Sequence, residues 1–222
     1  MIRTLILSFC IAAIVTGCKT AESVGSSSSK DRVSLSEEER RAYEIAFLDG
    51  NKEKILGNIT EAEQYFRIAL GINPYSDAAH FELAKISVER GRLGEAAILM
   101  EKARELDRDN LWYAEYLAQI YAETGRLDQA IETLEEIIEA KPDKVEYYFN
   151  LAALLGAQGK YEEAIKVYAD LEEKYGQMEE VAMQRQVIYR DQKKPEKALE
   201  EVDQLIEFNP SEIRYYGMKA EI

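Results

Sequence analysis

The chain has few of the residues on which most catalytic and metal sites depend. Its 222 residues include one histidine, His80, and two cysteines, Cys10 and Cys18. A serine or cysteine nucleophile activated by histidine would have to use His80, and a zinc site drawing on several histidines and cysteines is excluded by count. The sequence has no phosphate-binding loop and no dinucleotide-binding glycine pattern. We therefore expect no catalytic residue, no metal and no cofactor, and predict that the chain is not an enzyme.

Basic residues are scarce relative to acidic ones. The chain has 28 Lys and Arg against 42 Asp and Glu, and its net charge is −14. Nucleic-acid phosphates repel such a chain, and no basic stripe offsets the repulsion, so no nucleic-acid partner is expected. We assign acidic residues such as Glu132, Glu135, Glu136 and Glu139 to exposed helix faces that keep the protein soluble.

Five short strings recur at a fixed step of 34 residues. They are GNITEA at 57–62, GRLGEA at 91–96, GRLDQA at 125–130, GKYEEA at 159–164 and KKPEKA at 193–198. A repeat of this period indicates stacked supersecondary units rather than one globular core with a buried catalytic pocket.

Between these strings the apolar residues follow a helical period. Ala114, Leu117, Ala118 and Tyr121 recur at steps of three and four. This spacing places them on one face of a helix. A second amphipathic stretch follows and stops before Pro142, because proline breaks a helix. Each unit is therefore predicted to be helix, tight turn, helix, with Leu117 and Tyr121 buried between the two helices.

Turn and cap residues mark the expected helix ends. A glycine sits where each of the first four units turns, a place that favours a left-handed backbone. These glycines are Gly57, Gly91, Gly125 and Gly159. Ser36 with Glu39 has the spacing of a capping box that opens the first helix. Thr60 with Glu63 has the same spacing, and Asp128 is predicted to cap the equivalent helix two units later.

The units resemble the tetratricopeptide repeat over residues 43–210. Numbered from residues 43, 77, 111, 145 and 179, they have a small residue at position 8, alanine at position 20 and often proline at position 32, as that family does. Position 8 holds Gly50, Ala84, Ala118 and Ala152; position 20 holds Ala62, Ala96, Ala130, Ala164 and Ala198; position 32 holds Pro74, Pro142 and Pro210. The departures are Arg108 and Gly176 at position 32, Gln186 at position 8 and the pair Lys193–Lys194.

The resemblance implies an all-α fold over residues 36–222. This would be an α-solenoid of helix–turn–helix units, with five repeats plus the first helix of a sixth that restarts near residue 213. The pattern stops before a second helix for that unit, from which we expect the chain to be part of a longer protein. The alternative is that this lone helix acts as the cap of the array. His80 falls at position 4, where the family packs a large side chain, so a packing role is favoured over a catalytic one.

In this family the first helices line a concave groove through positions 2, 5, 9, 12 and 13. The residues predicted to bind a partner there are Phe47, Phe81, Lys85, Trp112, Gln119, Phe149 and Met183. Grouped exposed aromatics usually mark a binding surface. The alternative is that one or two of the phenylalanines are rotated into the packing between units. Because position 5 is largely apolar, an amphipathic helix or an extended apolar peptide fits the groove better than a terminal carboxylate.

The front of the chain has a different composition. In residues 1–17, Arg3 precedes an apolar run too short to span a bilayer, which is the layout of a secretory signal. The run ends in Val15–Thr16–Gly17–Cys18, which resembles the bacterial lipoprotein cleavage box and implies lipidation of Cys18. An ordinary signal peptide that happens to contain a cysteine is the alternative. Residues 18–35 then form a serine-rich tether.

These features predict a scaffold held on a membrane by lipid on Cys18. We expect it in a bacterial cell envelope, on the outer membrane and facing the periplasm, binding a protein partner in its groove. A glycan-binding lipoprotein that uses aromatic platforms is one alternative, and the adaptor part of a longer enzyme is another.

Overall fold

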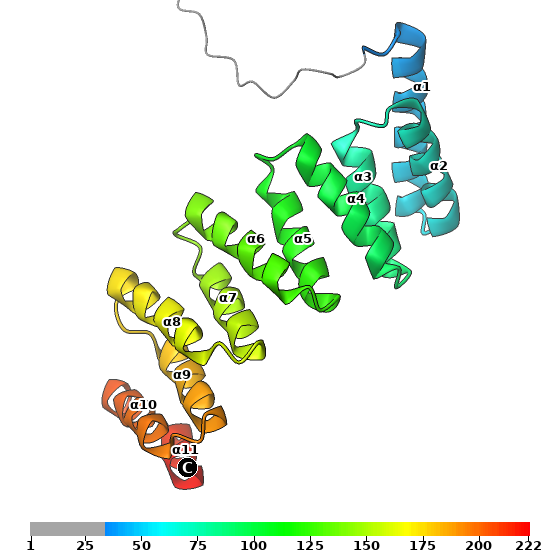
Figure 1. The fold of residues 1–222 in the computed structure, drawn as a ribbon. Coiled ribbons are helices and arrows are strands. Elements are labelled where there is room, and N and C mark those ends of the chain that lie inside the picture. The colour runs from blue at the N-terminus through cyan, green and yellow to red at the C-terminus, as the bar shows by residue number, and fades with distance from the viewer. Residues whose placement is uncertain (1–33) are drawn as a thin grey trace, which may run out of the picture. The chain divides into compact units, whose positions relative to one another are not determined.

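The computed structural model describes residues 34–222, so the predicted signal, Cys18 and nearly all of the tether lie outside the described residues. All regular structure in the described part is helical, which confirms the all-α prediction (Figure 1). The helices are α1 (Glu37–Ile55), α2 (Ile59–Ile72), α3 (Asp77–Glu89), α4 (Leu93–Leu106), α5 (Leu111–Glu123), α6 (Leu127–Ala140), α7 (Val145–Ala157), α8 (Tyr161–Tyr175), α9 (Glu179–Asp191), α10 (Pro195–Phe208) and α11 (Ile213–Glu221). Residues 35–222 form one compact unit.

The helices pack in chain order, as a repeat array requires. Each odd-numbered helix packs most extensively on the even-numbered helix that follows, and that helix then contacts the first helix of the next unit. Position 8 lies at the crossing within a unit, and a Cβ added to Gly50 would come within 2.8 Å of the Phe66 ring. Leu117 and Tyr121 are buried, as predicted, but in a cluster with Ala97 and Met100 of the preceding α4 as well as with Ala130 of α6, rather than only between the two helices of their own unit. Five two-helix units followed by α11 are therefore confirmed.

Within each unit the turn reverses the chain through a left-handed residue. The glycines of the first four units have φ between +71° and +80°. The residue after each glycine donates its N–H to a carbonyl five residues back, as from Arg126 N to Tyr121 O at 2.8 Å. This closes the end of the first helix. In the fifth unit Lys193 takes the same place with φ of 57°, which is costly for a residue with a Cβ.

One predicted cap is confirmed and two are wrong. Ser36 and Glu39 form the capping box that opens α1. Thr60 does not cap α2, because that helix already begins at Ile59 and its N-cap is Asn58. Asp128 likewise lies inside α6 rather than at its cap. The error has a simple cause: the glycine turn runs directly into the second helix, so the polar residues fall in its first turn.

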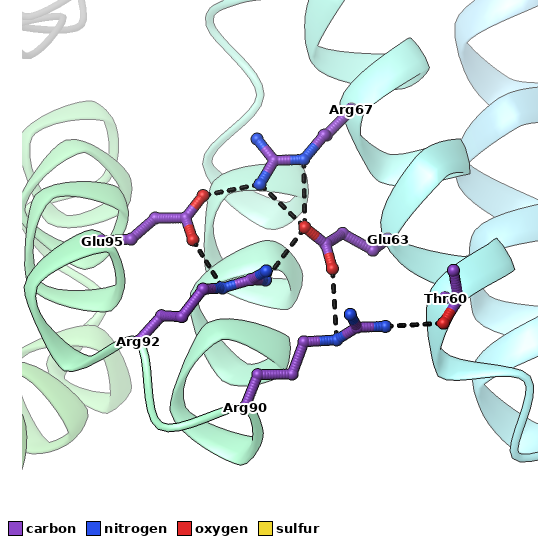
Figure 2. A network of polar contacts seen from close by, with 6 residues as sticks. All are labelled: Thr60, Glu63, Arg67, Arg90, Arg92 and Glu95. Carbon is purple, nitrogen blue, oxygen red and sulfur yellow. Dashed lines mark hydrogen bonds and ion pairs between the residues drawn. The ribbon is translucent and has the colours of Figure 1, made fainter.

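Glu63, which was predicted to form a capping box with Thr60, instead lies at the centre of an ion cluster between the first two units (Figure 2). Its carboxylate lies 2.8 Å from Arg67, 2.9 Å from Arg92 and 3.2 Å from Arg90. Arg67 and Arg92 also pair with Glu95, at 2.6 Å and 2.8 Å. The cluster therefore joins α2 to the turn and second helix of the next unit.

Proline in a link between units coincides with a polar aromatic residue at position 4. His80 Nε2 lies 3.0 Å from the Pro74 carbonyl oxygen. Tyr148 and Tyr216 donate to the carbonyls of Pro142 and Pro210 at 3.1 Å. In the two units without that proline, position 4 is alanine. Burial lowers the pKa of His80, consistent with a neutral ring used for packing and link bonding.

The link between α8 and α9 differs from the others. It has three residues rather than four, and Gly176 ends α8 with φ of 86° and ψ of 176°, a region open essentially to glycine alone. The Met178 N–H donates to the Glu172 carboxylate at 3.2 Å instead of closing a turn. The fifth unit thus departs from the repeat at its entrance as well as at its internal turn.

Candidate partner-binding face

The predicted groove residues all lie on first helices, at matching positions of successive units. We call the surface formed by positions 2, 5, 9, 12 and 13 of α1, α3, α5, α7 and α9 the first-helix face. Trp112 is 57% exposed and Gln119 is also exposed. The other predicted residues, all half-buried, are Phe47, Phe81, Lys85, Phe149 and Met183. That these seven bind a partner stays a prediction.

Each phenylalanine at position 5 has one part of its ring packed in the core and another part exposed to solvent. The Phe47 ring lies 5.6 Å from that of Phe66, and the Phe149 ring lies 5.4 Å from that of Tyr168, centroid to centroid. Both partners are buried. The phenylalanines at position 5 therefore help to pack the units while leaving part of each ring accessible. Removing one would change stability as well as any binding.

Aromatic side chains join α3 to α5 on the first-helix face. Phe81 lies 5.4 Å from Tyr116 in an edge-to-face arrangement, and Trp112 lies 6.3 Å from Tyr116. We call Phe81, Trp112 and Tyr116 the aromatic patch. Lys85 Nζ lies 5.2 Å above the Phe81 ring, so its charge is held at the border of this patch. Tyr116 was missed from the sequence, although its place four residues after Trp112 puts both on one helix face.

A pocket of about 450 Å³ lies beside the patch, between α5 and α7. We call it the α5–α7 pocket. Its apolar lining consists of Ala118, Ala122, Leu134, Ala153 and Leu154, and its polar lining of Glu115, Gln119, Tyr147 and Asn150. Gln119 alone among the predicted residues lines it. Small side chains contribute to this pocket: Ala122 is at position 12 of the third unit, where the second unit has Val88, and Ala153 is at position 9 of the fourth unit, where the fifth has Val187.

Charges at one edge of this pocket are satisfied within the protein. The Tyr147 hydroxyl donates to the Glu115 carboxylate, and Lys141 Nζ lies 3.7 Å from the same carboxylate. Burial, and then the bond to Glu115, raise the pKa of Tyr147, which stays protonated at neutral pH. Gln119 and Asn150 lie at the exposed rim, where the Gln119 amide donates to the Glu123 carboxylate at 2.9 Å and keeps its carbonyl oxygen as an acceptor. This arrangement can accept an apolar side chain and hydrogen-bond a peptide backbone.

Two other kinds of site can be addressed for the described part of the chain. No group of three or more His, Cys, Asp and Glu side chains within residues 34–222 is placed to hold a metal ion. None of the helices formed by these residues is both long and apolar enough to cross a membrane.

Comparison with protein families identifies the repeat. A model described as a tetratricopeptide repeat matches residues 55–114 and 88–155, and a second model with the same description matches residues 145–173. The chain belongs to the tetratricopeptide repeat family. Together the matches span residues 55–173, more than half of the chain. A comparison with curated proteins found no match.

Solved structures share the fold at low sequence identity. YrrB, described as a TPR protein with an unusual peptide-binding site, is 20% identical with a TM-score of 0.62, and the match covers 83% of this chain and 98% of YrrB. MamA is 16% identical with a TM-score of 0.65, covering 79% of this chain and 96% of MamA. A tetratricopeptide repeat protein from Parabacteroides merdae is 19% identical with a TM-score of 0.63, covering 82% and 72%.

Proposed function

We propose that this protein is a lipid-anchored scaffold of a bacterial cell envelope that binds a protein partner on its first-helix face. The tetratricopeptide fold is itself typical of protein–protein interaction scaffolds rather than enzymes. The observation that carries the proposal is the aromatic patch lying beside the α5–α7 pocket, with Trp112 and Gln119 on the same helix. An exposed tryptophan with a half-buried tyrosine beside it provides the aromatic anchors that dominate many interfaces.

The partner segment is an amphipathic helix or an extended apolar peptide. A pocket with an alanine and leucine lining takes one apolar side chain of that segment, and the rim amides bond its backbone. A peptide ligand has a precedent in the fold, because the description of YrrB names a peptide-binding site.

The anchoring part of the proposal rests on residues 1–18 of the sequence. Lipid on Cys18 would hold the chain on a membrane, and the serine-rich tether would let the repeat array reach its partner. Labelled palmitate should be incorporated by the full-length chain in a bacterial host and not by Cys18→Ala. Equal labelling of both forms, or none of either, would contradict lipidation at Cys18.

The groove is tested by crosslinking in the native envelope. A photo-reactive residue at Gln119 should capture a specific protein, and Trp112→Ser or Ala153→Trp should each abolish the capture. Ala153 is exposed, so the larger side chain fills the pocket without disturbing the core. Ile98→Ser, at an exposed position of the second helix α4, is the matched control and should leave capture unchanged. Capture that survives both groove variants would contradict the proposal.

A glycan ligand is the second candidate, favoured by the exposed Trp112 ring beside Tyr116. Titration with soluble glycans should change tryptophan fluorescence if sugars stack on this platform. A protein groove predicts no response.

A further inference from the structure

A separate hollow lies among α6, α7 and α8, away from the first-helix face, with a volume of about 440 Å³. We call it the α6–α8 groove. Its apolar lining consists of Ile138, Tyr148, Leu151, Leu155 and Val167. Its charged rim consists of Glu135, Glu139, Glu163, Lys166 and Asp170. The groove therefore combines an apolar base with four carboxylates and a single ammonium.

The rim carboxylates are not neutralised by the rest of the repeat array. Glu135, Glu139, Glu163 and Asp170 are all exposed. Within residues 34–222, none of the four forms an ion pair, and none accepts a hydrogen bond from a side chain. Four exposed carboxylates around an apolar base give the groove a negative potential that attracts a cation.

Between α2 and α4 the corresponding place is bridged by a guanidinium. Arg67 Nη2 lies 2.6 Å from Glu95 Oε1. Two repeat periods later, Glu135 takes the place of Arg67, and Glu163 takes the place of Glu95. The α6–α8 groove thus has two carboxylates where the front of the array has an ion pair, and like charges cannot draw its walls together.

Between α4 and α6 a second ion pair crosses the units. Arg104 pairs with Glu136. One period later these positions are Ile138 and Asp170, so the acid is kept while the arginine is replaced by an apolar residue.

Between α8 and α10 an arginine fills the same space. Arg185 lies 2.8 Å from Glu172 and 2.9 Å from Glu201. One repeat period earlier, Leu151 takes the place of Arg185. Ile138 and Val167 take the places of Glu172 and Glu201. Of the four places where second helices of successive units face one another in residues 34–222, the α6–α8 groove alone has no bridging guanidinium.

We propose that the α6–α8 groove docks a cationic amphipathic helix of a partner protein. Leucine-like side chains on one face of that helix cover the apolar lining, and lysine or arginine on its flanks pairs with the rim carboxylates. The partner thereby supplies the cation that the other three places have within the chain. A second copy is a poor occupant, because the chain's net charge of −14 opposes self-association through an acidic rim.

The proposal is tested with a labelled peptide of about 18 residues, long enough to form a helix, in which leucine and lysine follow a helical period. Fluorescence anisotropy gives its Kd. Glu135→Arg should raise the Kd by about tenfold or more, because the new arginine can pair with Glu163 as Arg67 pairs with Glu95, and one carboxylate is lost. Glu132→Arg makes the same charge change on an exposed residue of α6 outside the groove, and should raise the Kd less than about twofold.

The controls separate this docking from other causes. Trp112→Ser should leave peptide binding unchanged, so a failure here is distinct from a failure of the first-helix face. If Glu135→Arg does not fold, Asp170→Lys on the opposite wall should weaken binding similarly. Equal losses in Glu135→Arg and Glu132→Arg would overturn the proposal. So would equal binding of an isomeric peptide whose leucines alternate, or self-association that Glu135→Arg abolishes.

Discussion

Two buried glutamates, one near each end of the repeat array, have pKa values shifted in opposite directions. Glu63 is 8% exposed and Glu201 is 6% exposed. Glu63 faces three guanidinium groups, those of Arg67, Arg90 and Arg92 (Figure 2). Glu201 has one, that of Arg185, which it shares with Glu172.

Burial and neighbouring charges together decide which way each pKa moves. Burial by itself raises the pKa of Glu63, but the hydrogen bonds and charges of Arg67 and Arg92 outweigh it, and the pKa is lowered from 4.5. Burial raises the pKa of Glu201 as well, Arg185 does not outweigh it, and the carboxylates of Glu172 and Glu200 raise the pKa further. Low exposure alone therefore does not predict the sign of the shift, which is set by the balance between burial and the charges around the carboxylate.

The sign of each shift determines its contribution to stability. Glu63 has a lowered pKa in the folded state, so its charge stabilises the fold above the unfolded-state pKa, and this is lost as pH falls through the folded-state pKa. Glu201 has a raised pKa, so its ionisation destabilises the fold at neutral pH. That penalty is relieved as pH falls through the raised value.

Removing the shared arginine should have the largest effect. Arg185→Ala leaves the buried carboxylate of Glu201 and the half-buried carboxylate of Glu172 without a cation, and removing one partner of a buried ion pair typically costs about 3–5 kcal/mol. Urea unfolding at neutral pH measures the loss, with Arg190→Ala, an exposed arginine of the same helix, as the control. A loss no greater than that of the control would mean that the ion pairs of Arg185 with Glu172 and Glu201 are not shielded from water.

Glu63→Gln should cost about 2 kcal/mol at neutral pH, because three arginines lose their common anion. The difference from the wild type should shrink as pH falls through the lowered pKa of Glu63, where the wild-type carboxyl becomes protonated. Glu61→Gln, exposed on the same helix, is the control. A cost that does not change with pH would show that packing rather than charge is responsible.

Introducing the apolar residues of the α6–α8 groove at positions 172, 185 and 201 tests whether the ion pairs of Arg185 with Glu172 and Glu201 are needed for stability. Glu172→Ile, Arg185→Leu and Glu201→Val together should unfold at an equal or higher urea concentration, with a gain of about 1–2 kcal/mol, because well-packed apolar residues often replace buried ions without loss. A marked destabilisation would show that these ion pairs help to hold the irregular α8–α9 link in place.

Glu201→Gln should have the smallest effect and the opposite sign to Glu63→Gln. Arg185 keeps Glu172 as a partner, so we expect a gain of up to about 1 kcal/mol at neutral pH. The gain should vanish as pH falls and the wild-type carboxyl becomes protonated. Glu207→Gln, exposed on the same helix, should show neither the gain nor the pH dependence.

The helices and their pairing could be predicted because contacts in a repeat array join neighbours in the sequence. The period placed the turn glycines and the burial of Leu117 and Tyr121 correctly. The caps at Thr60 and Asp128 could not be distinguished from first-turn residues, since the two differ by only two residues along the chain.

The candidate site was only partly predictable. Its helix faces followed from the repeat positions, but the half-burial of Phe47 and Phe149 depends on rings that the partner helices present to them. The α5–α7 pocket depends on two alanines from different units lying side by side. Neither could be read from one unit alone.

The amino-acid sequence by itself determined the helices, the unit boundaries and the family, because these depend on local periodicity. Tertiary structure alone decided which glutamates are paired with arginines of a neighbouring unit. Glu63 and Glu135 are both glutamates on second helices, but Arg90 and Arg92 of the next unit reach Glu63, whereas Glu135 is exposed and unpaired among the described residues.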